Sequence, residues 1–314
     1  MGDRVRARTA PDGLVIIDKP AGLTSHDVVA RVRRLVGTRK VGHAGTLDPM
    51  ATGVLILGIE RATRLLGHLA LTQKSYDGTI RLGISTLTDD AEGQVVARAD
   101  AATVTAEAIR TGVQELTGQL MQRPTAVSAI KVDGVRSYTR VRSGEDVELP
   151  ARPVTVTSFV IHDIRQEIVE GAVVVDLDAT VECSSGTYIR ALARDLGAAL
   201  GVGGHLTRLR RTRVGSFGLE VAVTLEQLAA DPRVLPAVEA VRTQFGTVSV
   251  QAELARQILH GSPVLAEQIE GLAQIRPLSA AAEPGPIGLV DPDGVLLSLA
   301  QEQNGVLAHL VVFS

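Results

Sequence analysis

Apolar and polar positions along the chain predict short buried strands that alternate with amphipathic helices. Residues 13–18 and 54–57 are continuous apolar runs, which is typical of strands buried in a core. Between these runs, apolar side chains recur at helical spacing, so we expect a helix capped by Thr24 or Ser25 and ended by Gly37. The chain therefore begins as a mixture of helix and strand.

The same patterns continue through the rest of the chain. Expected helices cover residues 60–71, 103–120, 187–200, 225–241 and 252–259, and expected strands cover residues 74–83, 154–164 and 172–181. Asp133-Gly134 is a hairpin-turn signal, and the charged stretch 136–150 is typical of an exposed insertion. From residue 248 onward, short strands alternate with Gly, Pro and Asp turns, which predicts a small β-rich module.

Length and composition narrow the class of protein. A chain of 314 residues suits two domains better than one. Cys183 is the only cysteine, so no disulfide can form within the chain. No apolar run approaches the ~20 residues of a membrane-spanning helix, and the basic first ten residues are followed by no apolar signal-peptide core. We therefore expect a cytoplasmic protein.

The net charge of −3 is distributed unevenly. Residues 248–314 hold seven acids against two arginines, a net of −5, which leaves +2 for residues 1–247. Within that larger part, basic residues form the clusters Arg31/Arg33/Arg34/Arg39/Lys40 and Arg208/Arg210/Arg211/Arg213. A single cluster is usually a solvated face, but two clusters are what contact with a phosphate backbone requires.

The stretch KVGHAGTLDPMATG, residues 40–53, concentrates candidate chemistry. Its glycines let the backbone turn sharply or lie close to a ligand, and Pro49 fixes the dihedral that follows Asp48. Asp-Pro also begins ordinary surface turns, so a plain turn is the alternative. Against that alternative, a ring (His43), two hydroxyls and a carboxylate stand directly before the apolar run 54–57, which would hold the loop rigidly.

This stretch closely resembles the GxLDPxATG signature of the bacterial TruB family, the tRNA pseudouridine synthases that act on the TΨC loop. Four further stretches match in the family's order, and they read GLVIIDKPAGLTSHDVV, KSYDGTIRLGISTLTDDAEG, RPTAVSAIKVDGVRSY and CSSGTYIRALARDLG. The resemblance implies an isomerase that converts uridine at position 55 of tRNA to pseudouridine. It is closest to an actinobacterial-like form with a short C-terminal domain.

The resemblance also implies the architecture. We expect an α+β protein with the pseudouridine synthase fold, a long mixed and mainly antiparallel sheet flanked by helices. The expected parts are a flexible N-terminal arm (1–12), a catalytic domain (13–247) with a thumb-like insertion at about 124–152, and an RNA-binding domain similar to the PUA domain (248–314).

Residue roles are carried over from the family onto the matching positions. Asp48 would be the catalytic carboxylate, paired with Arg190, which would lower its pKa. Tyr76 would stack on the target base and assist proton transfer, and Lys19 would be a supporting charge. His43 would fill the gap that the flipped base leaves in the RNA stack. The expected RNA contacts further include Gly45, Thr46, Arg136, Arg140, Arg142, Arg208 and Arg211.

Isomerisation breaks a C1′–N1 bond and rejoins the uracil through C5, so it needs no redox step or phosphate transfer. We therefore expect no cofactor and no metal, in keeping with the absence of a GxGxxG or Walker loop. The polar stretch 86–93 lacks the alternating ligands of a calcium loop. The expected partner is tRNA, through its TΨC stem-loop and elbow, with no membrane contact, and the protein is expected to be a monomer. An RNA-binding or tRNA-folding protein on the same scaffold, with catalysis secondary, is the alternative function.

Overall fold

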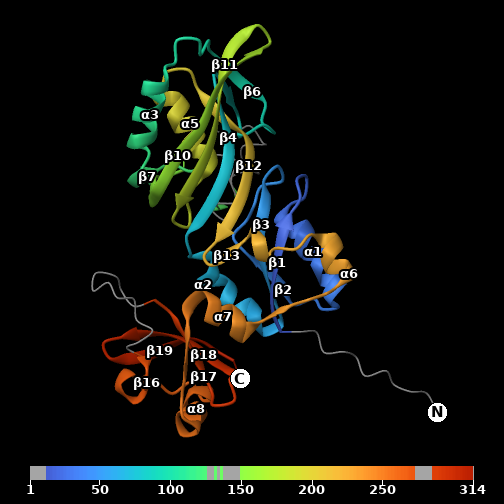
Figure 1. Cartoon of the computed structure of the whole chain (residues 1–314), viewed down its shortest axis with the longest axis vertical. Helices are drawn as coiled ribbons and strands as arrows, with labels where there is room; N and C mark the ends of the chain where they lie inside the picture. Colours follow the sequence, from blue (N-terminus) through green and yellow to red (C-terminus); the bar gives the residue numbers. More distant parts are fainter. Residues whose placement is uncertain (1–11, 126–130, 133–134, 137–148, 273–284, 314) are drawn as a thin grey trace, which may run out of the picture.

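A ten-stranded sheet runs through the larger part of the molecule in the computed structural model (Figure 1). The structure describes residues 12–125, 131–132, 135–136, 149–272 and 285–313. The strands of this sheet are β1 (Gly13–Lys19), β2 (Val41–Ala44), β3 (Thr52–Ile59), β4 (Lys74–Leu82), β7 (Gly118–Gln122), β10 (Arg152–Val169), β11 (Ala172–Cys183), β12 (Gly204–Val214), β13 (Phe217–Gly218) and β14 (Leu235–Pro236).

Their order is β14-β1-β3-β12-β4-β11-β10-β7, with β2 beside β3 and β13 beside β12. Strands β3 and β12 pair in parallel, and the other neighbours pair antiparallel. The expectation of a mixed, mainly antiparallel sheet in an α+β protein is confirmed. Two small hairpins stand apart, β5 (Ile84–Thr86) with β6 (Val95–Arg98) and β8 (Lys131–Val132) with β9 (Val135–Arg136).

Six of the described helices fall into three groups around this sheet, and the seventh, α8, packs on the C-terminal sheet. They are α1 (Ser25–Val36), α2 (Leu66–Ala70), α3 (Ala106–Glu115), α5 (Ile189–Ala199), α6 (Leu225–Ala230), α7 (Ala237–Phe245) and α8 (Ala252–Leu259), with short 3₁₀ turns η1 (Glu60–Leu65), η2 (Leu219–Val221) and η3 (Ala266–Gln268). Helices α3 and α5 cover the half formed by β4, β10, β11 and β12, α1 and α6 cover the half near β1, and α2 and α7 face the C-terminal sheet (Figure 1). None of the helices in the described part combines the length and apolar character that crossing a bilayer would need.

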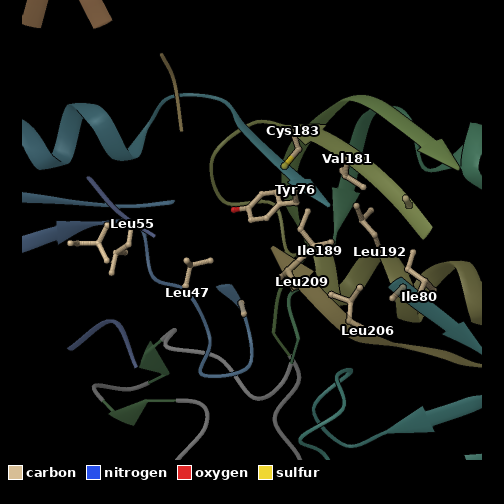
Figure 2. Close-up of a cluster of buried hydrophobic side chains, with 14 of the residues drawn as sticks. Leu47, Leu55, Tyr76, Ile80, Val181, Cys183, Ile189, Leu192, Leu206 and Leu209 are labelled. Carbon is tan, nitrogen blue, oxygen red and sulfur yellow. The ribbon is translucent and has the colours of Figure 1, made fainter. Parts of the chain in front are cut away.

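The first apolar runs are continuous because β1 and β3 are buried on both faces. Val15 and Leu55 pack into the cluster beneath α1 and α5, whereas Ile16 and Ile56 pack into a second cluster on the opposite face. In β4 and β11 only one face is apolar, so Tyr76, Val181 and the lone Cys183 join the first cluster (Figure 2). A strand with two buried faces loses the alternation that a half-exposed strand keeps.

Helix α1 begins and ends at the predicted residues. The Thr24 side chain accepts a hydrogen bond from the backbone of Asp27, and the Asp27 side chain accepts one from the backbone of Thr24, which makes a capping box. Gly37 ends the helix in the left-handed region, at φ 74°. The Ser25 hydroxyl is buried at this helix start and reaches the candidate catalytic loop, as described below.

A second sheet forms the C-terminal part, in the order β15-β17-β18-β19-β16. Its strands are β15 (Thr247–Ser249), β16 (Val264–Leu265), β17 (Ile287–Val290), β18 (Leu296–Gln303) and β19 (Val306–Val312). Leu299 and Phe313 of this part share a buried cluster with Leu65 and Leu69 beside α2. The two sheets are therefore joined by a common hydrophobic contact.

Three expected helices are shorter or differently built in the structure. The segment expected as one helix at 103–120 is α3 followed by β7, because Gly118 takes a φ of 101° that a helix cannot continue. The segment 60–71 starts as 3₁₀ helix before it becomes α2. The region 225–241 is two helices, since Asp231-Pro232 interrupts it.

Candidate active site

The loop that carries Asp48 is fastened to the sheet by buried polar side chains on both sides. Lys19, fully buried, donates from Nζ to the carbonyl oxygens of Pro20, Leu23 and Pro49 at 3.0, 2.6 and 3.2 Å. The Ser25 hydroxyl accepts from the Leu47 amide at 2.9 Å and donates to the Leu47 carbonyl at 3.1 Å. Asp48 thus lies between two residues whose backbone groups are held.

Arg211 fastens the same loop from strand β12. Its guanidinium donates to the carbonyl oxygens of Val54, Gly45 and Thr46, at 2.7, 3.1 and 3.3 Å. Gly53 is required at the end of the loop, because a Cβ there would lie 2.1 Å from the Arg211 carbonyl oxygen. The close approach of the backbones of β3 and β12 lets one arginine hold both ends of the loop.

Asp48 pairs with Arg190, the second residue of α5. The Arg190 Nε lies 3.0 Å from the Asp48 carboxylate, and its Nη1 lies 3.2 Å from the Asp90 carboxylate and donates to the Thr88 carbonyl at 2.7 Å. The side chains of Arg190 and Asp90 are 6% and 4% exposed, whereas 37% of the Asp48 side chain is exposed. Asp90 therefore binds the guanidinium on its buried side, and Asp48 binds it on the side that is open to solvent.

Arg190 lowers the pKa of Asp48 as expected, but the net shift of that pKa is upward. Pairing with Arg190 alone would lower it, but loss of hydration on burial raises the pKa above its ordinary value and outweighs the arginine. The nearby Asp90 carboxylate adds to the rise, while Lys19 opposes it. Burial also lowers the pKa of Lys19 to about 8, so both charged groups are held in an environment that disfavours their charge.

Asp48 opens into a cavity of about 290 Å³, at the small end of the range for ligand pockets. The cavity is lined by Gly45, Thr46, Leu47, Asp48, Ala70, Lys74, Tyr76, Gly186, Thr187, Tyr188, Ile189, Arg190, Leu209 and Arg211. Tyr76 is 8% exposed and extends from β4, with its hydroxyl turned away from Val181 and Leu192 (Figure 2). Burial raises its pKa, so the phenol keeps its proton at neutral pH. The structure thus brings Asp48, Tyr76 and Arg190 to one cavity.

The basic cluster Arg208/Arg210/Arg211/Arg213 does not form one exposed face, because Arg211 is buried. This side chain is 1% exposed, because register places it opposite Tyr76 on the cavity side of the sheet. Arg208 is exposed and donates to the Thr79 hydroxyl, Arg210 pairs with Asp18, and Arg213 pairs with Glu182. Irregularities in the β12 register, after Leu206 and after Arg211, separate these arginines between the two faces.

His43 lies on β2 rather than in a loop, two residues before Gly45 of the cavity lining. Its ring centroid is 5.5 Å from that of His26, and the two rings meet edge to face. Burial, with help from His26, lowers the His43 pKa, which favours the neutral imidazole. Gly45 and Thr46 follow directly, and Gly45 has a φ of 82° that favours glycine.

Other predicted residues lie beyond what the structure describes. Arg140 and Arg142 fall outside the described residues, and Arg136 is described only as part of the short strand β9. No three His, Cys, Asp or Glu side chains gather as a metal site would need within the described ranges. Asp89 and Asp90, in the stretch weighed as a calcium loop, instead bind Arg194 and Arg190.

Three residues of the site were missed by the sequence reasoning: Lys74 and Tyr188, which line the cavity, and Asp90, which pairs with Arg190. Asp90 could have been suspected, because an adjacent pair of acids matches two arginines four residues apart on one helix face. Lys74 gave no signal, since lysine is rarely buried. Tyr188 lies directly before α5 and two residues before Arg190, but its approach to the cavity depends on where the helix starts.

Known proteins match nearly the whole chain. A profile described as TruB family pseudouridylate synthase (N terminal domain) matches residues 33–189, and one described as tRNA pseudouridylate synthase B C-terminal domain matches residues 190–237. A tRNA pseudouridine synthase B of Streptomyces avermitilis is 57% identical over 96% of this chain and 97% of its own length. The protein of that name from Thermobifida fusca is 54% identical over 96% and 99%.

Solved structures are similar at lower identity. A chain of a Cbf5-Nop10-Gar1 complex has a TM-score of 0.69 and 25% identity, and the match covers 97% of this chain and 85% of that one. A chain of an H/ACA RNP bound to a substrate RNA containing 2′-deoxyuridine has a TM-score of 0.66 and 25% identity, with 96% and 85% covered. The sheet and helices described above therefore recur in chains of these assemblies.

Proposed function

Because the chain belongs to the TruB family of pseudouridylate synthases, we propose that it converts a uridine in the TΨC loop of tRNA to pseudouridine. The observation that carries the site assignment is the buried Asp48–Arg190–Asp90 network, which points the Asp48 carboxylate at a cavity lined by Tyr76. Relatives named tRNA pseudouridine synthase B, more than half identical over nearly the full length, support tRNA as the substrate.

The chemistry that this site offers is an isomerisation in which atoms balance within the substrate. The C1′–N1 bond of uridine breaks, the uracil rotates, a C1′–C5 bond forms, and the proton on C5 is replaced by one on N1. The Asp48 carboxylate acts either as the nucleophile or by stabilising a glycal-like intermediate, and both routes require its ionised form. Arg190 supports that form, and Tyr76 lies where it can stack on the base and move a proton.

The uridine has to leave the RNA stack to reach Asp48. The cavity has a volume of about 290 Å³, and its lining begins at Gly45, two residues after His43, whose ring is suited to fill the vacated stack. The buried cations near Asp48 favour a polyanion, although the chain as a whole is slightly acidic. Contact with the tRNA elbow and action as a monomer complete the proposal.

Mass mapping of pseudouridine in an unmodified tRNA transcript, incubated with the full chain, tests this function. We expect one new pseudouridine, in the TΨC loop, and none when that uridine is replaced by cytidine. Modification at other uridines only, or no modification of any tRNA, would contradict the proposal.

A further inference from the structure

The candidate cavity carries positive charge that no acid neutralises. Its lining contains three cations, Lys74, Arg190 and Arg211, and one carboxylate, Asp48. Arg190 is neutralised by Asp48 and, from behind the cavity wall, by Asp90. Within the part of the chain that the structure describes, no carboxylate forms an ion pair with Lys74 or Arg211, which are 6% and 1% exposed.

Lys74 and Arg211 flank the same point of the cavity wall. Strands β4 and β12 pair antiparallel with Arg211 opposite Tyr76, and Lys74 lies two residues before Tyr76 on the same face. A Cβ built on Gly45 would lie 3.5 Å from Nη1 of Arg211 and 3.9 Å from Cε of Lys74. The two side chains therefore meet beside Gly45, three residues before Asp48.

Both cations are held by backbone oxygens that carry only partial charges. Lys74 donates from Nζ to the carbonyls of Ala70 and Thr72, at 2.7 and 2.5 Å, and an ammonium group has one further N–H to give. Arg211 has five N–H groups, of which three go to carbonyls of the loop and of β3, and a further hydrogen bond joins its side chain to Tyr76. Two desolvated like charges side by side are costly, and a bound anion would relieve that cost.

We propose that Lys74 and Arg211 form a phosphate site that holds the phosphodiester next to the target uridine. The inference rests on the proposed function, because the RNA substrate supplies the phosphate. A guanidinium fork with an adjacent ammonium suits the oxygens of a phosphodiester. Since every nucleotide carries this group, the contact positions the flipped nucleotide along the chain without reading its base. Holding the RNA backbone beside Gly45 then brings C1′ of the uridine to Asp48. Recognition of the uracil alone is not needed for this placement.

The test measures the coupling between the protein cation and one RNA phosphate. Three TΨC stem-loops are compared, one unmodified and two in which the phosphate on the 5′ or the 3′ side of the target uridine is a neutral methylphosphonate. We expect one of the neutral phosphates to weaken binding by wild-type protein about tenfold, or ~1.4 kcal/mol. In Lys74→Met the same replacement should weaken binding clearly less, by about threefold, because one of the two partner charges is absent while Arg211 remains.

Two further variants control for folding and for net charge. Lys74→Arg keeps the cation and should retain most of the wild-type response to the neutral phosphate. Arg165→Met removes a cation that binds Asp163 and Asp178 on the opposite face of the sheet, and it should keep the full response. An equal loss with the neutral phosphate in wild type and in Lys74→Met would overturn the proposal.

A second measurement needs no variant. Burial and the neighbouring Arg211 lower the pKa of Lys74 to about 8, with the Cys183 thiol adjacent and Asp48, Tyr76 and Arg190 lining the same cavity. An anion beside Lys74 raises that pKa, so binding at pH 8 should take up protons. Calorimetry in buffers of different ionisation enthalpy should find greater uptake with the unmodified stem-loop than with the sensitive methylphosphonate. Equal uptake would overturn the site while the wild-type enzyme still makes pseudouridine, and a failure of the proposed function would instead appear as no pseudouridine at all.

Discussion

The two faces of the sheet around β4 and β12 treat charge in opposite ways. On the outer face, cations and acids alternate in pairs, such as Arg81 with Asp176 at 2.6 Å and Arg213 with Glu182 at 2.8 Å. On the cavity face, Lys74 and Arg211 are more deeply buried and lie against backbone carbonyls. On the outer face, each of these cations has an acidic partner within the protein. On the cavity face, Lys74 and Arg211 have no acidic partner among the described residues, and we propose that the RNA phosphate supplies it.

Replacing the cavity carboxylate should have the largest effect. We expect Asp48→Asn to abolish pseudouridine formation, because an amide can neither attack carbon nor stabilise a developing cation. Affinity for tRNA should change by less than about tenfold, ~1.4 kcal/mol, since the cations remain. Single-turnover assays and filter binding with one tRNA transcript measure both, and turnover near the wild-type rate would show that Asp48 is not catalytic.

Removal of the cavity-side arginine should damage both activity and fold. Arg190→Met leaves the buried Asp90 carboxylate without its cation, and breaking such a buried pair costs about 3–5 kcal/mol. We expect chemical denaturation to give that loss in the free energy of unfolding, together with loss of turnover. In the double variant Arg190→Met/Asp90→Asn, stability should recover while activity stays absent, which separates the structural role from the catalytic one.

The raised pKa of Asp48 should make activity and stability follow pH in opposite directions. A carboxyl with a folded pKa above its unfolded value stabilises the fold through its protonated form, fully below pH 3.8 and progressively less as pH rises through the folded pKa. Relative to Asp48→Asn, the wild-type free energy of unfolding should therefore fall across that window as turnover rises. Denaturant titrations and single-turnover rates over the same pH series measure both, and parallel trends would contradict this reading of the site.

The outer face should give the smallest effect. Arg213→Gln breaks a half-exposed pair with Glu182, and such pairs contribute about 0–1 kcal/mol. We expect a change in unfolding free energy within that range and unaltered turnover of a stem-loop substrate. A loss as large as that of Arg190→Met would mean that the contrast between the two faces does not hold.

The sequence predicted the loop that carries Asp48 and the helix that carries Arg190, but not how their charges are arranged. Asp48, Tyr76 and Arg190 stand in recognisable motifs. Thr24 and Gly37 predict the ends of α1, because capping depends only on neighbouring residues. The burial of Arg211 depends on strand register, which the irregularities in β12 shift. No local pattern carries that information.

The direction of the Asp48 pKa could not be predicted for a related reason. The motif match identifies Arg190 as its partner, but desolvation depends on how tightly the surrounding elements close over the carboxylate. Asp90, which completes the network, stands in a stretch that matches the family, but the sequence analysis assigned it no role and weighed its turn only as a metal site. The division of residues 225–241 into two helices was, by contrast, readable from Asp231-Pro232.

Cys183, the one thiol of the chain, gives the molecule a built-in chemical reporter. It is fully buried at the end of β11, paired in register with Lys74, and burial raises its pKa to about 11 (Figure 2). Alkylating reagents attack the thiolate, so the folded site resists them both by closure and by protonation. Each labelling event then records an opening of the sheet beneath the cavity, and the labelling rate yields the free energy of that opening. RNA bound in the cavity should slow the alkylation of Cys183, so the alkylation rate reports the fraction of protein that has RNA bound.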